Sequence, residues 1–302
     1  MGRAQIVTSP RPLLLDGGTG SALLQADITA ADCPGAWPLE RAEQLAAVHR
    51  AFIEAGADIV LSASFSATTA RLASHPHLAT RVEELCARSI TLVREAIEQT
   101  AVDRHGPRVA GNIGAAYGPV AAAEQREAAM EKVYRRSAEA LARAGAELLF
   151  VETIGCTREA LCALRAGQHT DLPVLISMVF SETPTGFRSL SNEDPRDCLL
   201  TLEQAGADGF GINCNLNANQ AARLALSLLP ETSLPLAIQP CAGQPRQQDG
   251  RLEYPASGDA FISAQYRVAR SGAAIVGGCC GITAADIARL RVALDSDLGA
   301  KP

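Results

Sequence analysis

A short phrase in which glycine separates a helical stretch from an apolar run recurs four times, and it constrains the fold more than any other feature. It reads Ala55-Gly56-Ala57-Asp58, Ala144-Gly145-Ala146-Glu147, Ala205-Gly206-Ala207-Asp208 and Ser271-Gly272-Ala273-Ala274. Glycine commonly ends an α-helix, because it adopts left-handed backbone angles without penalty. Each phrase therefore predicts a helix that stops and a β-strand that begins directly afterwards.

Eight short apolar runs alternate with stretches of helical periodicity, and the phrases precede every second run. The runs are Leu13–Leu15, Asp58–Ser64, Arg108–Ile113, Glu147–Glu152, Pro173–Phe180, Asp208–Asn213, Leu234–Gln239 and Ala273–Val276. Continuous apolar strands that alternate with helices indicate a parallel sheet covered on its outer face. Eight such units predict an α/β fold, a single (β/α)8 TIM barrel. We expect one domain over residues 1–302, with a core of about 12–294, because no Pro/Ser-rich linker divides the chain.

Composition narrows the class of protein. The chain has 302 residues, of which 47% are hydrophobic and 20% charged, and a net charge of −6. The charge gives no electrostatic reason to expect nucleic acid or an anionic membrane as a partner. The first residues, MGRAQIVTSPRP, lack the apolar stretch of a signal peptide, and no run approaches a membrane span. Nine cysteines in a chain of this length do not make a disulfide scaffold, so we expect a cytoplasmic enzyme.

Polar residues follow the predicted strands at their carboxyl ends, where the active sites of such barrels lie. They are Asp16, Ser62, Ser64, Asn112, Glu152, Asn213, Cys214, Cys241, Cys279 and Cys280. Asp16 precedes Gly17-Gly18, so turn chemistry is an equal alternative for that residue alone. Glu152 is harder to explain structurally, because a carboxylate beside a barrel core needs a partner or a ligand. Taken together, the placement favours a functional site.

Three of these cysteines suggest a metal site. Cys279 and Cys280 are adjacent in Gly277-Gly278-Cys279-Cys280-Gly281, a geometry that disfavours a disulfide between them. With Cys214 from another strand they make a set of three thiolate ligands, which suits zinc and leaves its fourth position open. Small buried core residues remain the alternative of about equal weight, because free cysteine is often buried.

The motifs together resemble the homocysteine S-methyltransferase family, which includes the homocysteine module of cobalamin-dependent methionine synthase. The resemblance covers about residues 12–294. Its carriers are Asp16-Gly17-Gly18-Thr19-Gly20, Gly56-Ala57-Asp58 with Ser64-Phe65, Gly111-Asn112-Ile113-Gly114, Glu152-Thr153-Ile154, Gly211-Ile212-Asn213-Cys214 and Gly277–Gly281.

The resemblance implies a zinc-dependent enzyme that activates homocysteine as a zinc-bound thiolate and methylates it to methionine. Zn2+ would be bound by Cys214, Cys279 and Cys280. The resemblance also implies that Asp16 and Glu152 hold the substrate ammonium. The substrate carboxylate would meet backbone N–H groups of the segment 17–19. The substrate-binding residues implied by the resemblance are Asp16, Gly17, Gly18, Thr19, Glu152 and Asn213. No catalytic residue is expected beyond the activated thiol of the substrate.

The methyl donor is left open by the sequence. A sulfonium compound, S-methylmethionine or S-adenosylmethionine, is favoured slightly. Betaine or a separate methyl-corrinoid protein is the alternative, as is a different thiol or a selenol as acceptor. The chain departs from the family at Ala63, where members have Asn, and at Ile282, where they have Thr.

Cys241 is a third departure, because family members have Asn at this position. It suggests either a replaceable fourth ligand, a disulfide partner when zinc is lost, or a small residue that only fills space. A non-catalytic barrel whose zinc is structural is a further alternative, because four cysteines would complete a structural site.

Overall fold

Eight parallel strands form one sheet in the computed structural model, which describes residues 11–25, 33–100, 106–248 and 251–296. The strands are β1 (Leu13–Leu14), β2 (Ile59–Leu61), β3 (Arg108–Gly114), β4 (Leu148–Ile154), β5 (Val174–Met178), β8 (Gly209–Asn217), β9 (Leu236–Cys241) and β12 (Ile275–Val276). Their order is β1-β12-β9-β8-β5-β4-β3-β2, and a parallel bridge from Leu15 to Ile59 joins the two outermost strands. The predicted (β/α)8 barrel is confirmed, with all eight strands inside the expected runs or within a few residues of them.

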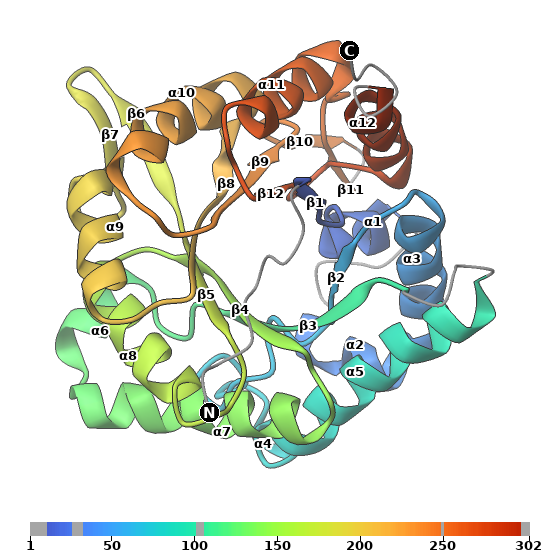
Figure 1. Cartoon of the computed structure of the whole chain (residues 1–302). Helices are drawn as coiled ribbons and strands as arrows, with labels where there is room; N and C mark the ends of the chain where they lie inside the picture. The colour runs from blue at the N-terminus through green and yellow to red at the C-terminus, as the bar shows by residue number, and fades with distance from the viewer. Residues whose placement is uncertain (1–10, 26–32, 101–105, 249–250, 297–302) are drawn as a thin grey trace.

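Helices surround the sheet on its outer side (Figure 1). The longer ones are α1 (Thr19–Gln25), α3 (Ala42–Glu54), α5 (Val82–Gln99), α7 (Glu127–Arg143), α8 (Thr157–Gly167), α9 (Pro195–Gln204), α10 (Ala218–Leu228), α11 (Gly258–Arg270) and α12 (Ala284–Ser296). Short turns of helix are α2 (Trp37–Glu40), α4 (Pro76–Ala79) and α6 (Pro119–Glu124). In the part of the chain that the structure describes, no helix is long and apolar enough to cross a bilayer. The prediction that no signal peptide is present concerns mainly residues 1–10, which lie outside the described residues.

Two hairpins that the sequence did not predict extend the barrel beyond strands β5 and β9. One pairs β6 (Phe180–Thr183) with β7 (Gly186–Ser189), and the other pairs β10 (Arg246–Gln248) with β11 (Arg251–Glu253). Both follow the carboxyl end of a barrel strand, so they stand at the same end of the barrel as the candidate site.

The recurring phrase ends a helix each time, as predicted. Its glycines Gly56, Gly145, Gly206 and Gly272 have φ values of 89°, 94°, 83° and 110°. These left-handed angles let the chain leave the helix and enter the next strand within two residues.

The acidic residue of the phrase has a second role, which the sequence did not reveal. Asp58, Glu147 and Asp208 stand directly before β2, β4 and β8. Their side chains accept the N–H groups of Leu14 at 2.8 Å, Val109 at 3.1 Å and Val174 at 2.9 Å, each at the start of the neighbouring strand. The carboxylates thus fix the register of adjacent strands at the amino end of the barrel.

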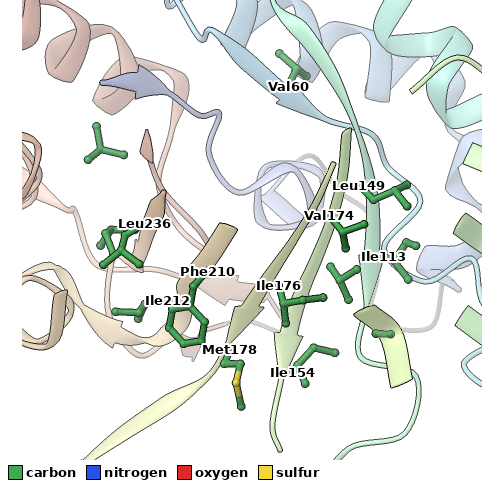
Figure 2. Close-up of a cluster of buried hydrophobic side chains, with 14 of the residues drawn as sticks. Val60, Ile113, Leu149, Ile154, Val174, Ile176, Met178, Phe210, Ile212 and Leu236 are labelled. Carbon is green, nitrogen blue, oxygen red and sulfur yellow. The ribbon is translucent and has the colours of Figure 1, made fainter. Parts of the chain in front are cut away.

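Apolar side chains pack on both faces of the strands. The larger cluster lies between strands and helices and includes Leu149, Val174 and Phe210 (Figure 2). A second cluster contains buried side chains from strands and strand ends alone, so it fills the barrel interior: Leu15, Ile59, Leu61, Ala110, Leu148, Phe150, Leu175, Ala237 and Ile275. Alternation along β4 puts Leu148 and Phe150 inside. Continuing that alternation carries Glu152 to the inside as well.

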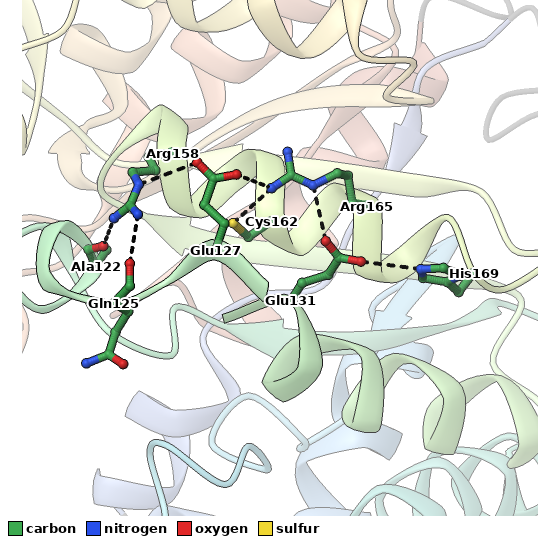
Figure 3. A network of polar contacts seen from close by, with 8 residues as sticks. All are labelled: Ala122, Gln125, Glu127, Glu131, Arg158, Cys162, Arg165 and His169. Atoms are coloured by element: carbon green, nitrogen blue, oxygen red, sulfur yellow. Dashed lines mark hydrogen bonds and ion pairs between the residues drawn. The ribbon is translucent and has the colours of Figure 1, made fainter. Parts of the chain in front are cut away.

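Ion pairs join α7 to α8 on the outer surface (Figure 3). Glu127 pairs with Arg165 at 2.8 Å, and Glu131 pairs with Arg165 at 3.2 Å. Glu131 also hydrogen-bonds to His169, just after α8, at 3.4 Å. Exposed pairs of this kind contribute about 0–1 kcal/mol each. They stabilise helix packing and take no part in the site described next.

Candidate metal and substrate site

Four cysteine side chains meet at the carboxyl end of the barrel. Cys214 lies in β8, Cys241 ends β9, and Cys279 and Cys280 follow β12. Their Sγ atoms all lie within 4.8 Å of one another, and each of the four is a free thiol. The Sγ atom of Cys280 lies 3.9 Å from those of Cys214 and Cys279, which are 2.7 Å apart. The structure therefore brings together the three predicted metal ligands and Cys241.

Backbone conformation turns Cys214 toward this cluster. Cys214 and Asn215 have φ values of 55° and 54°, in the left-handed region that residues with a side chain rarely adopt. The side chain of Asn215 fixes the bend by donating to the carbonyl of Phe180 and to the hydroxyl of Ser181, both at 2.9 Å. Such angles cost about 1–2 kcal/mol for a residue such as Cys214, whereas asparagine adopts them more readily. This unfavourable backbone conformation occurs where the Cys214 sulfur has to point toward the other cysteines.

The glycines after β1 allow the chain to approach the cysteine pair closely. A Cβ atom on Gly18 would lie 2.7 Å from the carbonyl oxygen of Cys279, too close for any side chain. The N–H of Gly278 donates to the carbonyl of Asp16, and that of Gly18 to the carbonyl of Ile282, both at 3.1 Å. The segment 16–19 and the cysteine pair therefore form one rigid unit.

Asp16 is fully buried, and only one of its two carboxylate oxygens has a hydrogen-bond partner. Its Oδ2 accepts the N–H of Leu61 at 2.9 Å, whereas Oδ1 has no hydrogen-bond partner. Burial raises the pKa of Asp16 well above its usual value, and the charge of Glu152 adds to the effect, although the Leu61 N–H opposes it. The two carboxylates predicted to act together are thus electrostatically coupled.

Glu152 is 7% exposed and lies among side-chain amides. Its Oε1 accepts from Asn112 at 2.8 Å and its Oε2 from Asn213 at 3.4 Å. Burial raises the pKa of Glu152 to about 7; the Asn112 amide opposes this shift, and the charge of Cys280 adds to it. A cation close to this carboxyl group would favour its charged form.

Asn213 positions other groups of the site. Its Oδ1 accepts from Thr153 N at 3.0 Å and from Ser177 Oγ at 2.8 Å, and its Nδ2 donates to Thr153 Oγ1 at 2.8 Å. Thr153 is itself held at a left-handed φ of 64°. Both polar atoms of the Asn213 side chain therefore have partners, and they orient the loop after β4 and the Glu152 carboxylate.

Asn112 is anchored by two serines from the neighbouring strand end. Ser62 Oγ lies 2.7 Å from Ser64 Oγ, Ser64 donates to the Asn112 carbonyl at 2.7 Å, and the Asn112 N–H donates to Ser62 at 3.1 Å. These three hydrogen bonds hold the segment 62–64. It contains Ala63, where the resemblance would place an asparagine. The Oδ1 atom of Asn112 has no partner, so a further acceptor is available beside Glu152.

The amides of Gly18 and Thr19 are already engaged within the protein. The Gly18 N–H donates to Ile282, and the Thr19 N–H donates to the Gly17 carbonyl at 3.0 Å. The buried Oγ1 of Thr19, in contrast, has no partner. The Thr19 hydroxyl therefore has free hydrogen-bonding capacity that these two N–H groups lack.

Two further groups of the site were not found from the sequence. Gln239 precedes the end of β9, and its buried Oε1 has no partner. Tyr254 follows the β10–β11 hairpin and packs against Gly281, next to Cys280. The neighbouring cysteines lower the pKa of Cys280, and Tyr254 adds to this effect. Alternation along β9 would have indicated Gln239, because Ala237 faces the interior. No sequence pattern indicated Tyr254.

The donor set fits a soft metal ion. Sulfur ligands select zinc or another thiophilic ion over magnesium or calcium. Tetrahedral zinc with bonds of about 2.3 Å separates two sulfurs by about 3.8 Å, close to the two separations of 3.9 Å. Cys214 and Cys279 would have to move apart by about 1 Å.

The chain is similar to known proteins over nearly its whole length. The family model described as homocysteine S-methyltransferase matches residues 13–294. The chain is 26% identical to a methionine synthase of Mycobacterium tuberculosis over 303 residues, which is 95% of this chain and 25% of that protein. It is 26% identical to homocysteine S-methyltransferase 4 of Zea mays, over 91% of this chain and 86% of the relative.

A solved structure has the same architecture. The metallated form of the homocysteine methyltransferase MmuM from Escherichia coli superposes with a TM-score of 0.76 at 26% identity, covering 94% of this chain and 96% of that one. The family match spans nearly the whole barrel, including every strand that carries a site residue. The chain therefore belongs to the homocysteine S-methyltransferase family.

Proposed function

We propose that this protein methylates the sulfur of homocysteine to give methionine, with a zinc ion bound by Cys214, Cys279 and Cys280. The observation that carries the proposal is a sulfur cluster beside two buried carboxylates, one of which has an acceptor atom without a partner. A small molecule with a thiol at one end and an ammonium at the other fits both halves of this arrangement.

Asp16 and Glu152 would bind the substrate ammonium. An ammonium group donates three hydrogen bonds. Asp16 Oδ1 and Asn112 Oδ1 are buried acceptors without partners, and Glu152 lies between Asn112 and Asn213. Because burial raises the pKa of both acids, a bound cation would stabilise their charged forms.

The substrate carboxylate would meet the Thr19 hydroxyl, since the N–H groups of Gly18 and Thr19 already have acceptors. Asn213 would contribute indirectly, because each polar atom of its side chain is bonded to Thr153, Ser177 or Glu152. We propose it as a positioning residue for Glu152.

A zinc ion on the three cysteines would keep the substrate thiol deprotonated at neutral pH, where a free thiol with a pKa near ~8.5 is mostly protonated. The residues around Asp16 and Glu152 would hold the amino acid so that its sulfur stays at the cysteine cluster and faces the barrel mouth. The methyl group passes from a sulfonium sulfur to the thiolate, so a neutral thioether leaves and the transfer itself needs no proton.

We propose S-methylmethionine or S-adenosylmethionine as the donor. The match to the maize enzyme covers 86% of that protein, which favours a small free donor. The match to only 25% of the mycobacterial methionine synthase motivates the alternative, a methyl group delivered by a separate corrinoid protein. Betaine is a further small donor to be tested.

The test is methionine formation by zinc-loaded protein from homocysteine and each donor in turn. Cys280→Ala is expected to lower zinc content and abolish turnover while the far-UV circular dichroism spectrum stays unchanged, because the barrel core is independent of the metal. Cys33→Ala is the matched control, since Cys33 is a partly exposed free thiol outside the cluster. Full zinc content and activity in Cys280→Ala would refute the proposal.

A further inference from the structure

Cys241 differs from the other buried cysteines in its surroundings. Cys86 and Cys198 pack in the large apolar cluster, and Cys156 and Cys162 pack in a small one. Cys241, at 7% exposure, is a member of no apolar cluster among the described residues. Its Sγ atom instead lies within 4.8 Å of three other sulfurs, those of Cys214, Cys279 and Cys280. A residue that only filled space would face carbon.

The backbone fixes Cys241 beside the cysteine pair. Strand β9 lies between β8 and β12 in the sheet, so its last residue stands between the strands that carry the other sulfurs. The N–H of Cys279 donates to the carbonyl of Pro240 at 2.9 Å, and that of Ala242 donates to the carbonyl of Cys280 at 3.0 Å. These two bonds flank Cys241, so its backbone is held beside the cysteine pair.

We infer that Cys241 is the fourth sulfur ligand of the resting metal site and the ligand that the substrate thiol displaces. Four sulfurs within 4.8 Å of one another match a complete tetrahedral set. The inference rests on the proposed function, because it assigns the position that the substrate sulfur is to occupy.

The exchange balances without an external base. The bond between the metal and the Cys241 sulfur breaks, and a bond between the metal and the substrate sulfur forms. The proton of the incoming thiol passes to the released Cys241 thiolate, so four thiolates surround the metal before and after the exchange. The net charge of the site is therefore unchanged when homocysteine enters.

The first measurement counts sulfurs at the zinc by X-ray absorption, without reference to activity. Resting zinc-loaded protein is expected to show four sulfurs, and Cys241→Ala three sulfurs with one oxygen or nitrogen. Homocysteine is expected to leave the count at four in the unaltered protein and to raise it from three to four in Cys241→Ala. Cys198→Ala is the control, because Cys198 is buried in the apolar cluster.

The second measurement uses the unaltered protein and therefore does not depend on how the variant folds. Zinc-loaded protein is treated with iodoacetamide with and without homocysteine, and the Cys241 peptide is quantified by mass spectrometry. Displacement predicts that homocysteine increases alkylation of Cys241 at least fivefold, whereas Cys214, Cys279 and Cys280 stay protected.

The outcomes separate the two ideas. Three sulfurs at rest that become four with homocysteine would overturn the role of Cys241 and leave the proposed function intact. Four sulfurs at rest, with Cys241 protected whether or not homocysteine is present, would overturn displacement and the proposed function together, because the site would be closed.

Discussion

Glu152→Gln offers the sharpest test of how the site holds its substrate. The carboxylate accepts from Asn112 at 2.8 Å and from Asn213 at 3.4 Å, so a glutamine would direct its one carbonyl oxygen to the nearer amide. The shape of the side chain is kept and the negative charge is lost. A charge-assisted hydrogen bond contributes about 1.5–3 kcal/mol. A loss of about 2 kcal/mol raises the homocysteine KM about 30-fold, within a range of about 10- to 150-fold.

The same substitution is expected to stabilise the protein without substrate. Folding raises the pKa of Glu152 from 4.5 to about 7, so the folded state holds its proton over a pH range in which the unfolded chain has lost it. Stability from this group is therefore full below pH 4.5 and falls as the pH rises to about 7. At pH 8 the carboxylate costs about 3 kcal/mol, which glutamine removes.

The assay combines steady-state kinetics with urea unfolding at pH 8 and pH 4. Glu152→Gln should raise KM, keep its zinc, and unfold at higher urea than the unaltered protein at pH 8 but not at pH 4. Glu147→Gln is the matched control, because Glu147 stands at the opposite end of β4 and accepts from Val109 there. An unchanged KM in Glu152→Gln would mean that the substrate is not held by its amine.

Three other substitutions test the site and the two ends of the barrel. Asp16→Asn should raise the homocysteine KM by the same order, about 10- to 150-fold, with zinc retained, since Asp16 has an acceptor atom without a partner. Asp208→Ala should lower the free energy of unfolding by about 1–3 kcal/mol in urea titrations, because the Val174 N–H loses its acceptor, and should leave KM unchanged. Asp208→Asn keeps an acceptor oxygen, so it should recover most of this loss. Burial lowers the pKa of His49 to about 4, so the unfolded chain is protonated first as the pH falls below 6.5. Between pH 7 and 5 this group alone lowers the free energy of unfolding by about 2 kcal/mol, opposite in sign to the contribution of Glu152 over the same range, so urea titrations have to compare the unaltered protein with His49→Leu; the same pH dependence in both proteins would contradict this.

The barrel was predictable because two independent signals coincided. Gly56, Gly145, Gly206 and Gly272 mark helix ends with positive φ, and an apolar run follows each of them. Strand ends were then located to within a few residues, which sufficed to place polar side chains at one end of the sheet. The convergence of Cys214 with the cysteine pair followed from strand closure alone.

Other features depended on distances that a one-dimensional pattern does not contain. The β10–β11 hairpin brings Tyr254 to Cys280, and no periodicity links these two segments. The engagement of the Gly18 amide arises from the close approach of segment 16–19 to Ile282, which is distant in sequence. The left-handed backbone of Cys214 is likewise a tertiary effect, since cysteine has no preference for such angles.

The carboxylates at the two ends of the barrel differ in how well the protein satisfies them. At the amino end, Asp58, Glu147 and Asp208 accept strand N–H groups, so each acid stabilises the fold. At the carboxyl end, Asp16 and Glu152 are buried with raised pKa values, and a cation would satisfy them better than the protein does. Strain at Cys214 lies at the same end. Stabilising contacts at the amino end of the strands thus offset the unfavourable charge and backbone geometry at the carboxyl end, where we propose that the substrate ammonium binds.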